Sequence, residues 1–150
     1  MTSAATRAAT LVRALQAGLE SERDVIEELF TDDVRAWTPA IAAASRQELL
    51  HQLDAYDDAF SELELEVAPL DVGGEYACVE WRVMMTHSGT LELAEAMKIE
   101  PTGLRITLHG VTVAEFRGDQ ICSLRQYWDE FSVLEQLGVL SSGSGAAAPS

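Results

Sequence analysis

Two apolar, β-rich runs separated by a tight-turn signal dominate the last third of the sequence. The first run, residues 104–116, carries Leu, Ile, Val and Phe, and Gly118-Asp119 then interrupts it. The second run, residues 121–128, carries Ile, Leu, Tyr and Trp. Residues of these types around a Gly-containing break predict two antiparallel strands joined by a hairpin. Such a pair must bury one sheet face against another layer of the fold.

A short helix is predicted directly after the second run. Asp129 closes the apolar strand, and Gly138 ends the helical pattern, as glycine commonly does. Between them, apolar residues recur at helical spacing: Phe131, Val133, Leu134 and Leu137.

Two further strands are predicted upstream. Residues 62–67 alternate glutamate with Leu or Val, which indicates a strand with one solvated face. Gly73-Gly74 marks the next turn. Residues 76–87 carry large apolar groups on both faces, interrupted on one face by Glu80 and Arg82. Because one domain has only one concave core, we expect the outer face to be covered by a second copy, giving a homodimer.

The N-terminal part predicts two helices and a short strand. Apolar residues at helical spacing indicate the first helix: Ala8, Leu11, Val12, Leu15 and Leu19. Ser21 and Asp24 resemble a capping box that starts a second helix, whose apolar face comprises Val25, Ile26, Leu29 and Phe30. Thr31-Asp32-Asp33 then breaks the pattern, and residues 34–37 suit a short strand that ends before Pro39.

A third helix is predicted after Ser45, which forms a capping box with Glu48. Its buried face is expected to contain Leu49, Leu50, Leu53, Tyr56 and Phe60. Residues 91–99 suit either a short helix or an ordered loop, and we treat them as a candidate lid.

Helices grouped before an antiparallel meander indicate an α+β fold. We expect a single domain over residues 1–140, with the helices on the concave side of a curved sheet and a pocket between the layers. Residues 141–150 are small, uncharged and rich in Gly and Ser, so they predict a disordered tail.

Charge and cysteine content exclude several classes of protein. The formal net charge of −15 disfavours nucleic acids and anionic membranes as partners, because both are recognised by clustered Lys and Arg. No apolar run approaches the ~20 residues of a membrane span, and the N-terminus lacks the pattern of a signal peptide. With only Cys78 and Cys122, neither a disulfide framework nor a metal site is indicated, which favours a reduced cytoplasmic setting.

The sequence resembles the SnoaL-like polyketide cyclase family of the nuclear transport factor 2-like superfamily. The matching segments are CVEWRVMMTHSG (78–89), EPTGLRITLHGVTVAEFRGDQI (100–121) and YWDEFSVLEQLG (127–138). They contain a Thr-His-x-Gly turn, a Pro-Thr-Gly before a strand, an aromatic-Asp pair and a Leu-x-Gln-Leu-Gly end, in that order. The resemblance covers roughly residues 8–140 and implies a cone with helices on the concave face of a mixed, mainly antiparallel sheet. The segment between His87 and Pro101 is longer than is usual in the family.

Asp129 is the principal catalytic candidate. It follows an apolar strand and adjoins aromatic residues, so its carboxylate is expected to be partly desolvated and a better proton acceptor. The resemblance places it where the cyclases keep an acid/base aspartate, and limonene epoxide hydrolases also keep an aspartate after a similar strand. The alternative is structural, because Asp is a favoured N-cap and a helix starts immediately afterwards.

Two histidines are further candidates. His109 lies within a predicted strand, where it could polarise a carbonyl group or relay a proton. Alternatively, it is a hydrogen-bonded histidine of the core or of a dimer interface. His87 belongs to the Thr-His-x-Gly turn, so it is expected to brace that turn or to reach the pocket rim.

Arg125, Tyr127 and Asp129 share one face of the last strand. This set suits carbonyl binding or epoxide opening. The epoxide-hydrolase pattern also needs an Arg-x-Asp on a neighbouring strand, where this chain has Glu80 followed by Trp81 and Arg82. That order disfavours epoxide hydrolysis, and an ion pair is the simpler role for Glu80 and Arg82.

Aromatic residues and methionines are expected either to line the pocket or to fill the core. The substrate-binding candidates are Trp37, Tyr56, Trp81, His87, Arg125, Tyr127 and Trp128, and Met84, Met85 and Met97 could add to the wall. No Ser-His-Asp order, phosphate loop or metal cluster stands out, so neither a cofactor nor a metal is expected.

The resemblance implies a cofactor-independent cyclase that closes a ring in a hydrophobic, polyketide-like small molecule, including flat polycyclic ones, by acid/base (aldol-type) chemistry. Two alternatives stay open at this point. One is a non-catalytic ligand-binding or dimerisation module of the same fold, and the other is an epoxide hydrolase or epoxide-opening cyclase.

Overall fold

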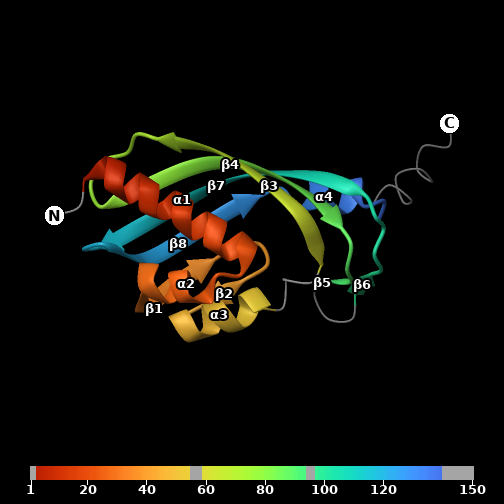
Figure 1. Ribbon diagram of the computed structural model, residues 1–150, viewed down its shortest axis with the longest axis horizontal. Helices are drawn as coiled ribbons and strands as arrows, with labels where there is room; N and C mark the ends of the chain where they lie inside the picture. Colours follow the sequence, from red (N-terminus) through yellow and green to blue (C-terminus); the bar gives the residue numbers. More distant parts are fainter. Residues whose placement is uncertain (1–2, 55–58, 94–96, 140–150) are drawn as a thin grey trace.

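A six-stranded sheet forms the centre of the fold (Figure 1). The computed structural model describes residues 3–54, 59–93 and 97–139. The strands of the sheet are β1 (Phe30–Trp37), β2 (Ala42–Ala43), β3 (Phe60–Leu70), β4 (Tyr76–His87), β7 (Arg105–Arg117) and β8 (Gln120–Trp128). Their order is β2-β1-β8-β7-β4-β3, in which β1 and β8 are parallel and all other neighbours are antiparallel. The mixed sheet and the α+β class predicted from the sequence are thus confirmed.

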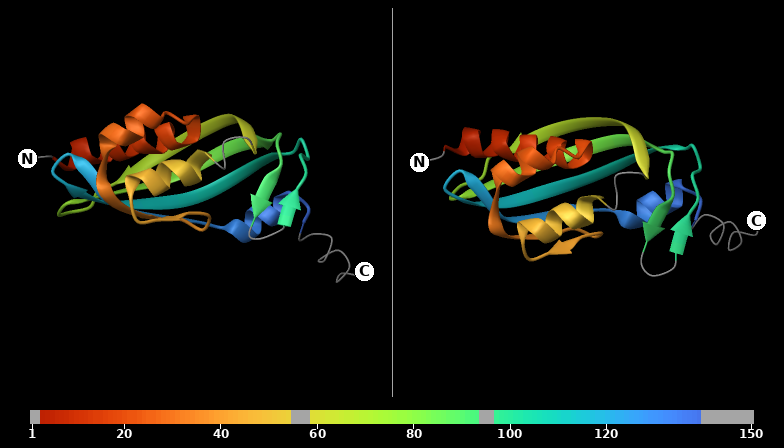
Figure 2. Two further views of the ribbon diagram at one scale, coloured as in Figure 1. Left: turned by 90° about the horizontal axis from the view of Figure 1, so that it is seen from below. Right: turned by 60° about the horizontal axis from the view of Figure 1, so that its bottom comes forward.

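Three N-terminal helices cover one face of this sheet: α1 (Ala4–Glu20), α2 (Arg23–Leu29) and α3 (Arg46–Asp54). α1 packs on β4 and β3, and α3 packs on β1 and β2, so the two helices lie over opposite edges of the sheet (Figure 2). The last helix, α4 (Glu130–Gln136), packs on β7. Within the described ranges, no helix is long and apolar enough to cross a membrane.

The junction of α1 and α2 differs from the prediction that Ser21 starts the second helix. Ser21 adopts a left-handed conformation (φ 58°), and its N–H donates to the carbonyl oxygen of Ala17, which closes the last turn of α1. It is therefore the C-cap of the first helix and cannot adopt the extended conformation of an N-cap. α2 begins at Arg23 without a side-chain cap at Glu22.

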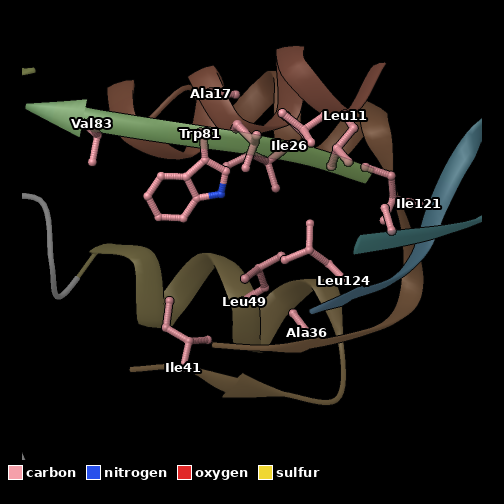
Figure 3. Close-up of a cluster of buried hydrophobic side chains, with 14 of the residues drawn as sticks. Leu11, Ala17, Ile26, Ala36, Ile41, Leu49, Trp81, Val83, Ile121 and Leu124 are labelled. Carbon is pink, nitrogen blue, oxygen red and sulfur yellow. The ribbon is translucent and has the colours of Figure 1, made fainter. Parts of the chain in front are cut away.

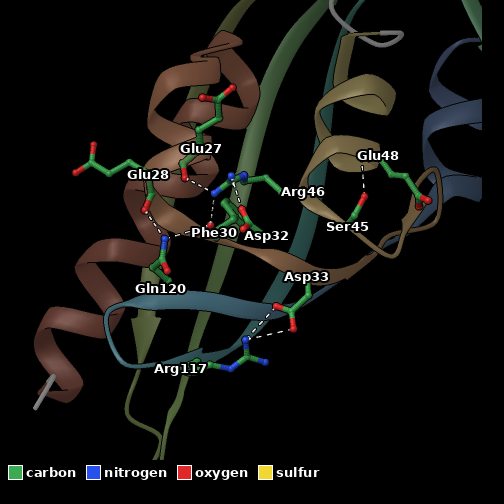
Figure 4. A network of polar contacts seen from close by, with 10 residues as sticks. All are labelled: Glu27, Glu28, Phe30, Asp32, Asp33, Ser45, Arg46, Glu48, Arg117 and Gln120. Atoms are coloured by element: carbon green, nitrogen blue, oxygen red, sulfur yellow. Dashed lines mark hydrogen bonds and ion pairs between the residues drawn. The ribbon is translucent and has the colours of Figure 1, made fainter.

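Strand β1 begins at Phe30, which the sequence pattern places in the preceding helix. Phe30 pairs with Ile121 of β8, a partner far away in the sequence. Two side chains bind the carbonyl groups at this helix-to-strand transition (Figure 4). Nη1 of Arg46 donates to the carbonyl oxygens of Glu27 (2.8 Å) and Phe30 (3.1 Å), and Nε2 of Gln120 donates to Phe30 as well (3.3 Å). These bonds satisfy backbone acceptors that the end of a helix leaves open.

The start of α3 partly follows the predicted capping box. Oγ of Ser45 accepts from the N–H of Glu48 at 3.1 Å, whereas the Glu48 carboxylate accepts from the N–H of Ala44 at 2.8 Å. Phe60, expected on the buried face of this helix, instead begins β3, and Tyr56 lies outside the described residues.

Strands β3 and β4 each have an inward and a more exposed outward face, and on β3 the inward Leu63 and Leu65 are only half-buried. The glutamates of residues 62–66 are exposed, and Glu66 forms an ion pair with Arg82 directly across the strand pair. On β4, the inward residues are buried: Ala77, Val79, Trp81, Val83 and Met85. The outward face is only half-buried and Tyr76 is exposed, so one copy of the chain covers one face of this strand, and the pairing with a second copy stays a prediction.

The segment predicted as a helix or loop over 91–99 contains two short strands instead. β5 (Leu91–Leu93) and β6 (Met97–Ile99) pair antiparallel as a separate two-stranded sheet. The predicted tail, 141–150, lies outside the described residues.

The core lies between the helices and the inner sheet face (Figure 3). Leu11 of α1 and Ile26 of α2 approach it from one side, Leu49 of α3 from the other, and Ile121 of β8 from the sheet. Leu11, Ile26 and Ile121 are fully buried. Burying a side chain of this size stabilises the fold by about 1.5–3 kcal/mol, so these contacts fix the helices over the sheet.

Candidate functional site

An apolar cavity of about 240 Å³ lies between the helices and the inner face of the sheet. Its wall combines residues of α1, α2 and α3 with inward residues of β3, β4, β7 and β8, among them Leu15, Ile26, Leu49, Phe60, Leu65, Trp81, Leu108 and Leu124. Thr38, Gln126 and Glu130 are the polar or charged side chains of the described lining. A concave, mainly apolar site with few polar groups is the usual form of a small-molecule site.

Strand β8 supplies three neighbouring residues of this wall, one of them polar. Leu124, Gln126 and Trp128 line the cavity, whereas Arg125 and Tyr127 are exposed on the opposite face. Alternation along the strand produces this division, because successive side chains point to opposite faces.

Glu130 is the carboxylate that lines the cavity. It is the first residue of α4, and its Oε2 accepts a hydrogen bond from Nε1–H of Trp128 at 3.0 Å. Within the described part of the chain, neither the second carboxylate oxygen of Glu130 nor the amide of Gln126 forms a hydrogen bond. The indole therefore holds the carboxylate in place, and one oxygen and one amide are available to a ligand.

Asp129 has a different environment. Its side chain is exposed, and Oδ1 accepts from the N–H of Ser132 at 3.1 Å, so it is the N-cap of α4. It is not among the residues that line the cavity. The structural role considered for Asp129 is therefore present, and its catalytic role stays a prediction.

Trp81 forms part of the cavity wall because Gly110 leaves room for its ring. A Cβ atom at position 110 would lie 2.2 Å from Cζ2 of Trp81 and 2.7 Å from the carbonyl oxygen of Tyr127. Nε1 of Trp81 donates to Oγ1 of Thr112 at 2.9 Å, and the ring meets Trp128 edge-on with centroids 6.3 Å apart. The position of the indole is thus fixed from the sheet side.

His87 is fully buried and braces the turn that precedes β7. Its Nδ1 lies 3.0 Å from Oγ1 of Thr102 and accepts from the N–H of Thr102 at 3.2 Å. Its backbone N–H donates to the carbonyl oxygen of Leu104 at 2.9 Å. Burial lowers the pKa of His87, so the imidazole is held neutral. Its ring packs 5.6 Å from that of Phe60, which itself lines the cavity.

Four of the predicted site residues lie away from the cavity. His109 and Arg125 are exposed, and neither is part of the lining. Trp37 and Tyr127 are 45% and 47% exposed and pack against each other with ring centroids 5.3 Å apart. Of the aromatic candidates that the structure describes, Trp81 and Trp128 belong to the wall, as does Met85.

The three polar residues of the wall, Thr38, Gln126 and Glu130, are not among the sequence-based candidates. The strand pattern contains a signal for Gln126, since it shares a face with Leu124 and Trp128. Glu130 carries no such signal, because it is in the wall only through the turn from β8 into α4. Among the residues described, no group of three or more His, Cys, Asp or Glu side chains is placed to hold a metal ion.

Both the sequence and the fold of this chain are similar to those of SnoaL-like proteins. The sequence profile of the SnoaL-like domain matches residues 9–124. No protein of curated function matches the sequence.

Solved structures share the fold at low sequence identity. A protein from Jannaschia sp. CCS1, provisionally named a SnoaL-like polyketide cyclase, aligns with a TM-score of 0.77 and 20% identity over 89% of this chain and 92% of its own. TsrD from Streptomyces laurentii aligns with a TM-score of 0.78 and 16% identity over 93% and 100%. An epoxide hydrolase from M. tuberculosis, described as LEH-like, aligns with a TM-score of 0.67 and 14% identity over 98% of both chains.

Proposed function

Because this chain belongs to the SnoaL-like domain family, we propose that it is an enzyme that acts without a cofactor on an apolar, polyketide-like small molecule. The observation that supports this proposal is the cavity, which combines an apolar wall with one carboxylate held by an indole N–H. A single placed base suffices for a carbon acid flanked by two carbonyl groups, because such a carbon is already acidic.

The proposed reaction is an intramolecular aldol closure. Glu130 removes a proton from the carbon between two carbonyl groups, and the resulting enolate carbon attacks a second carbonyl carbon of the same molecule. A carbon–carbon bond forms and the attacked carbonyl becomes an alkoxide. The protonated Glu130 then returns its proton to that alkoxide, so the carboxylate is regenerated. The hydrogen bond from Trp128 keeps the carboxylate aimed into the cavity during both transfers.

Two neighbouring carboxylates allow a direct test. Glu130→Gln should slow the chemical step by ~10²–10⁴, the usual contribution of a positioned acid or base, while ligand binding persists. Single-turnover assays on a panel of linear poly-β-ketone esters, followed by mass spectrometry, would measure this step. A full rate in Glu130→Gln together with a comparable loss in Asp129→Asn would transfer the role to Asp129, as the family resemblance implies.

A binding module without catalysis is the second candidate function. It is favoured by the small number of polar groups in the wall, since a purely storing or transporting protein needs only an apolar cavity. Tight binding of the same esters with no product formation in the wild-type protein would support this alternative.

We also propose that two copies pair through the outer face of the sheet. Trp37, Tyr76 and Tyr127 are large, exposed side chains, and exposed apolar patches of ~300–600 Å² commonly mark interfaces. Light scattering should give a dimer at micromolar concentration, and Tyr127→Lys should shift it toward the monomer. A monomeric wild-type protein would contradict the proposal.

A further inference from the structure

The polar groups of the cavity lie at one place on its wall. Trp37 pairs with Arg125 at the end of the parallel register of β1 and β8. Thr38 directly follows β1 and Gln126 directly follows Arg125, so both wall residues lie next to this pair. Glu130 lies two residues beyond the end of β8, and the hydrogen bond from Trp128 holds its carboxylate beside that strand. The cavity therefore has one polar end and an otherwise apolar wall.

The hydrogen bonds already present at this end determine which donors and acceptors are available to a ligand. Oγ1 of Thr38 accepts from the N–H groups of Ala40 (3.0 Å) and Ile41 (2.8 Å), which occupies both of its lone pairs and leaves its O–H as a donor. One oxygen of Glu130 is occupied by the Trp128 indole, and its other oxygen can only accept a hydrogen bond while it is ionised. The Gln126 amide can both donate and accept.

From this pattern we infer that the ligand of the cavity, in its ring-closed form, is an apolar ring compound with a hydrogen-bond donor, a hydroxyl or an amine, at the end that meets Gln126 and Glu130, and that it carries no anionic group there. A ligand carboxylate would face the carboxylate of Glu130 within a mainly apolar wall, where like charges repel more strongly than in water. The net charge of −15 adds a long-range repulsion of the same sign. This inference rests on the proposed function in taking the cavity as the substrate site.

The size of the cavity limits the ring system. An apolar protein cavity of about 150 Å³ holds one benzene ring, so the present cavity of about 240 Å³ suits a bicyclic ring system with a short side chain. Naphthalene derivatives are therefore suitable probes.

Four matched naphthalenes test the inference on the full-length protein: 2-naphthaleneethanol, 2-(2-naphthyl)ethylamine, the carboxylate 2-naphthaleneacetate and the hydrocarbon 2-ethylnaphthalene. Equilibrium dialysis at neutral pH measures each dissociation constant. The alcohol and the amine should bind at least about tenfold more tightly than the hydrocarbon, because a hydrogen bond to a charged group is among the stronger kinds. The acetate should bind more weakly than the hydrocarbon.

Two glutamates of α4 provide the variant and its control. Glu130→Gln should abolish the preference for the amine and improve binding of the acetate. Glu135→Gln removes the same charge from the same helix at an exposed position, so it should leave the order of the four probes unchanged. Circular dichroism verifies that both variants are folded, and the wild-type order already tests the inference by itself.

The outcomes separate the inference from the proposed function. If the alcohol, the amine and the acetate all bind with the same affinity as the hydrocarbon, the inference is wrong and the cavity remains a ligand site. If the acetate binds most tightly, the inference is also wrong. If no probe binds, both the inference and the use of this cavity as a substrate site are overturned. If the predicted order is found but the ketone esters are not converted, the inference stands and the catalytic proposal fails.

Discussion

Along β8, alternate side chains meet either the cavity or the outer surface of the sheet. Gln126 and Trp128 border an apolar space, while Arg125 and Tyr127 face solvent, where Tyr127 packs against Trp37 of the neighbouring strand. The same few residues of sequence therefore serve two different surfaces. The chemistry available to a side chain on this strand depends on its face at least as much as on its type.

Asp129 and Glu130 repeat this comparison at the end of the strand. The carboxylate of Asp129 accepts a hydrogen bond from a backbone N–H of α4, whereas the carboxylate of Glu130 accepts one from an indole N–H at the cavity. Two adjacent acids thus differ in partner and in surroundings. Removing either one should therefore have different consequences for stability and for ligand chemistry.

The largest expected contrast lies between Leu124 and Arg125. Leu124 is buried in the cavity wall, so Leu124→Ala should lower the free energy of unfolding by about 2–5 kcal/mol. Arg125→Ala changes an exposed side chain and should stay within about 0.5 kcal/mol. Urea denaturation followed by circular dichroism measures both values. Equal losses in the two variants would mean that the faces of β8 are not distinguished as described.

Gly110 tests whether the wall is fixed by the sheet. Gly110→Ala forces its new methyl group into the ring of Trp81, so we expect a loss of about 1–3 kcal/mol and an altered cavity. The double variant Gly110→Ala/Trp81→Phe removes the clashing atoms of the larger ring. Thermal unfolding should show that the two changes together cost less than their sum, and strict additivity would argue against this contact.

Asp129 allows the two acids to be compared in stability. Asp129→Ala should cost about 0.5–2 kcal/mol through loss of the cap, and Asp129→Asn should be nearly neutral because Asn caps about as well. Glu130→Gln should have no comparable effect on the helix start, since Glu130 caps no backbone group among the described residues. Thermal unfolding of the three variants side by side gives the comparison. A loss in Asp129→Asn as large as in Asp129→Ala would show that the charge, and not the cap, is what matters.

The buried His87 predicts the smallest effect, a pH dependence of stability. Burial lowers its pKa in the folded state, so below about pH 6.5, the ordinary value, the unfolded chain binds a proton that the folded chain does not. Stability should therefore fall as pH drops below about 6.5, by at most about 1.4 kcal/mol per pH unit from this group. Denaturation at a series of pH values should show a shallower slope in His87→Gln. His109→Gln, at an exposed position, is the matched control, and an unchanged slope in His87→Gln would contradict the assignment.

Much of the sheet can be predicted from the sequence, because its signals are local. The alternation of 62–67, the apolar run of 76–87 and the Gly118-Asp119 turn each specify a strand or a hairpin through neighbouring residues. The start of β1 could not be found in this way, since Phe30 continues a helical pattern and becomes a strand residue only by pairing with Ile121.

The residues that line the cavity are harder to predict from the sequence than the strands are. Periodicity identifies which residues of β8 share a face but does not state which face is covered by helices. For this reason Arg125 and Tyr127 are natural candidates in the sequence, although Gln126 and Trp128 are the residues in the wall. Glu130 depends on the direction in which the chain leaves β8, which a strand pattern does not contain.

The parallel pairing of β1 with β8 has a consequence for synthesis on the ribosome. A nascent chain that stops before residue 120 already contains all three N-terminal helices, yet its first strand lacks its principal neighbour. Until β8 emerges, β1 and the helices α2 and α3 that pack on it are not joined to the strands on which α1 packs, and such intermediates are prone to aggregation and are clients of chaperones. A premature stop codon that removes β8 would therefore leave a polypeptide prone to aggregation, and no small molecule could rescue it, because the cavity that Leu124, Gln126 and Trp128 help to line would not form.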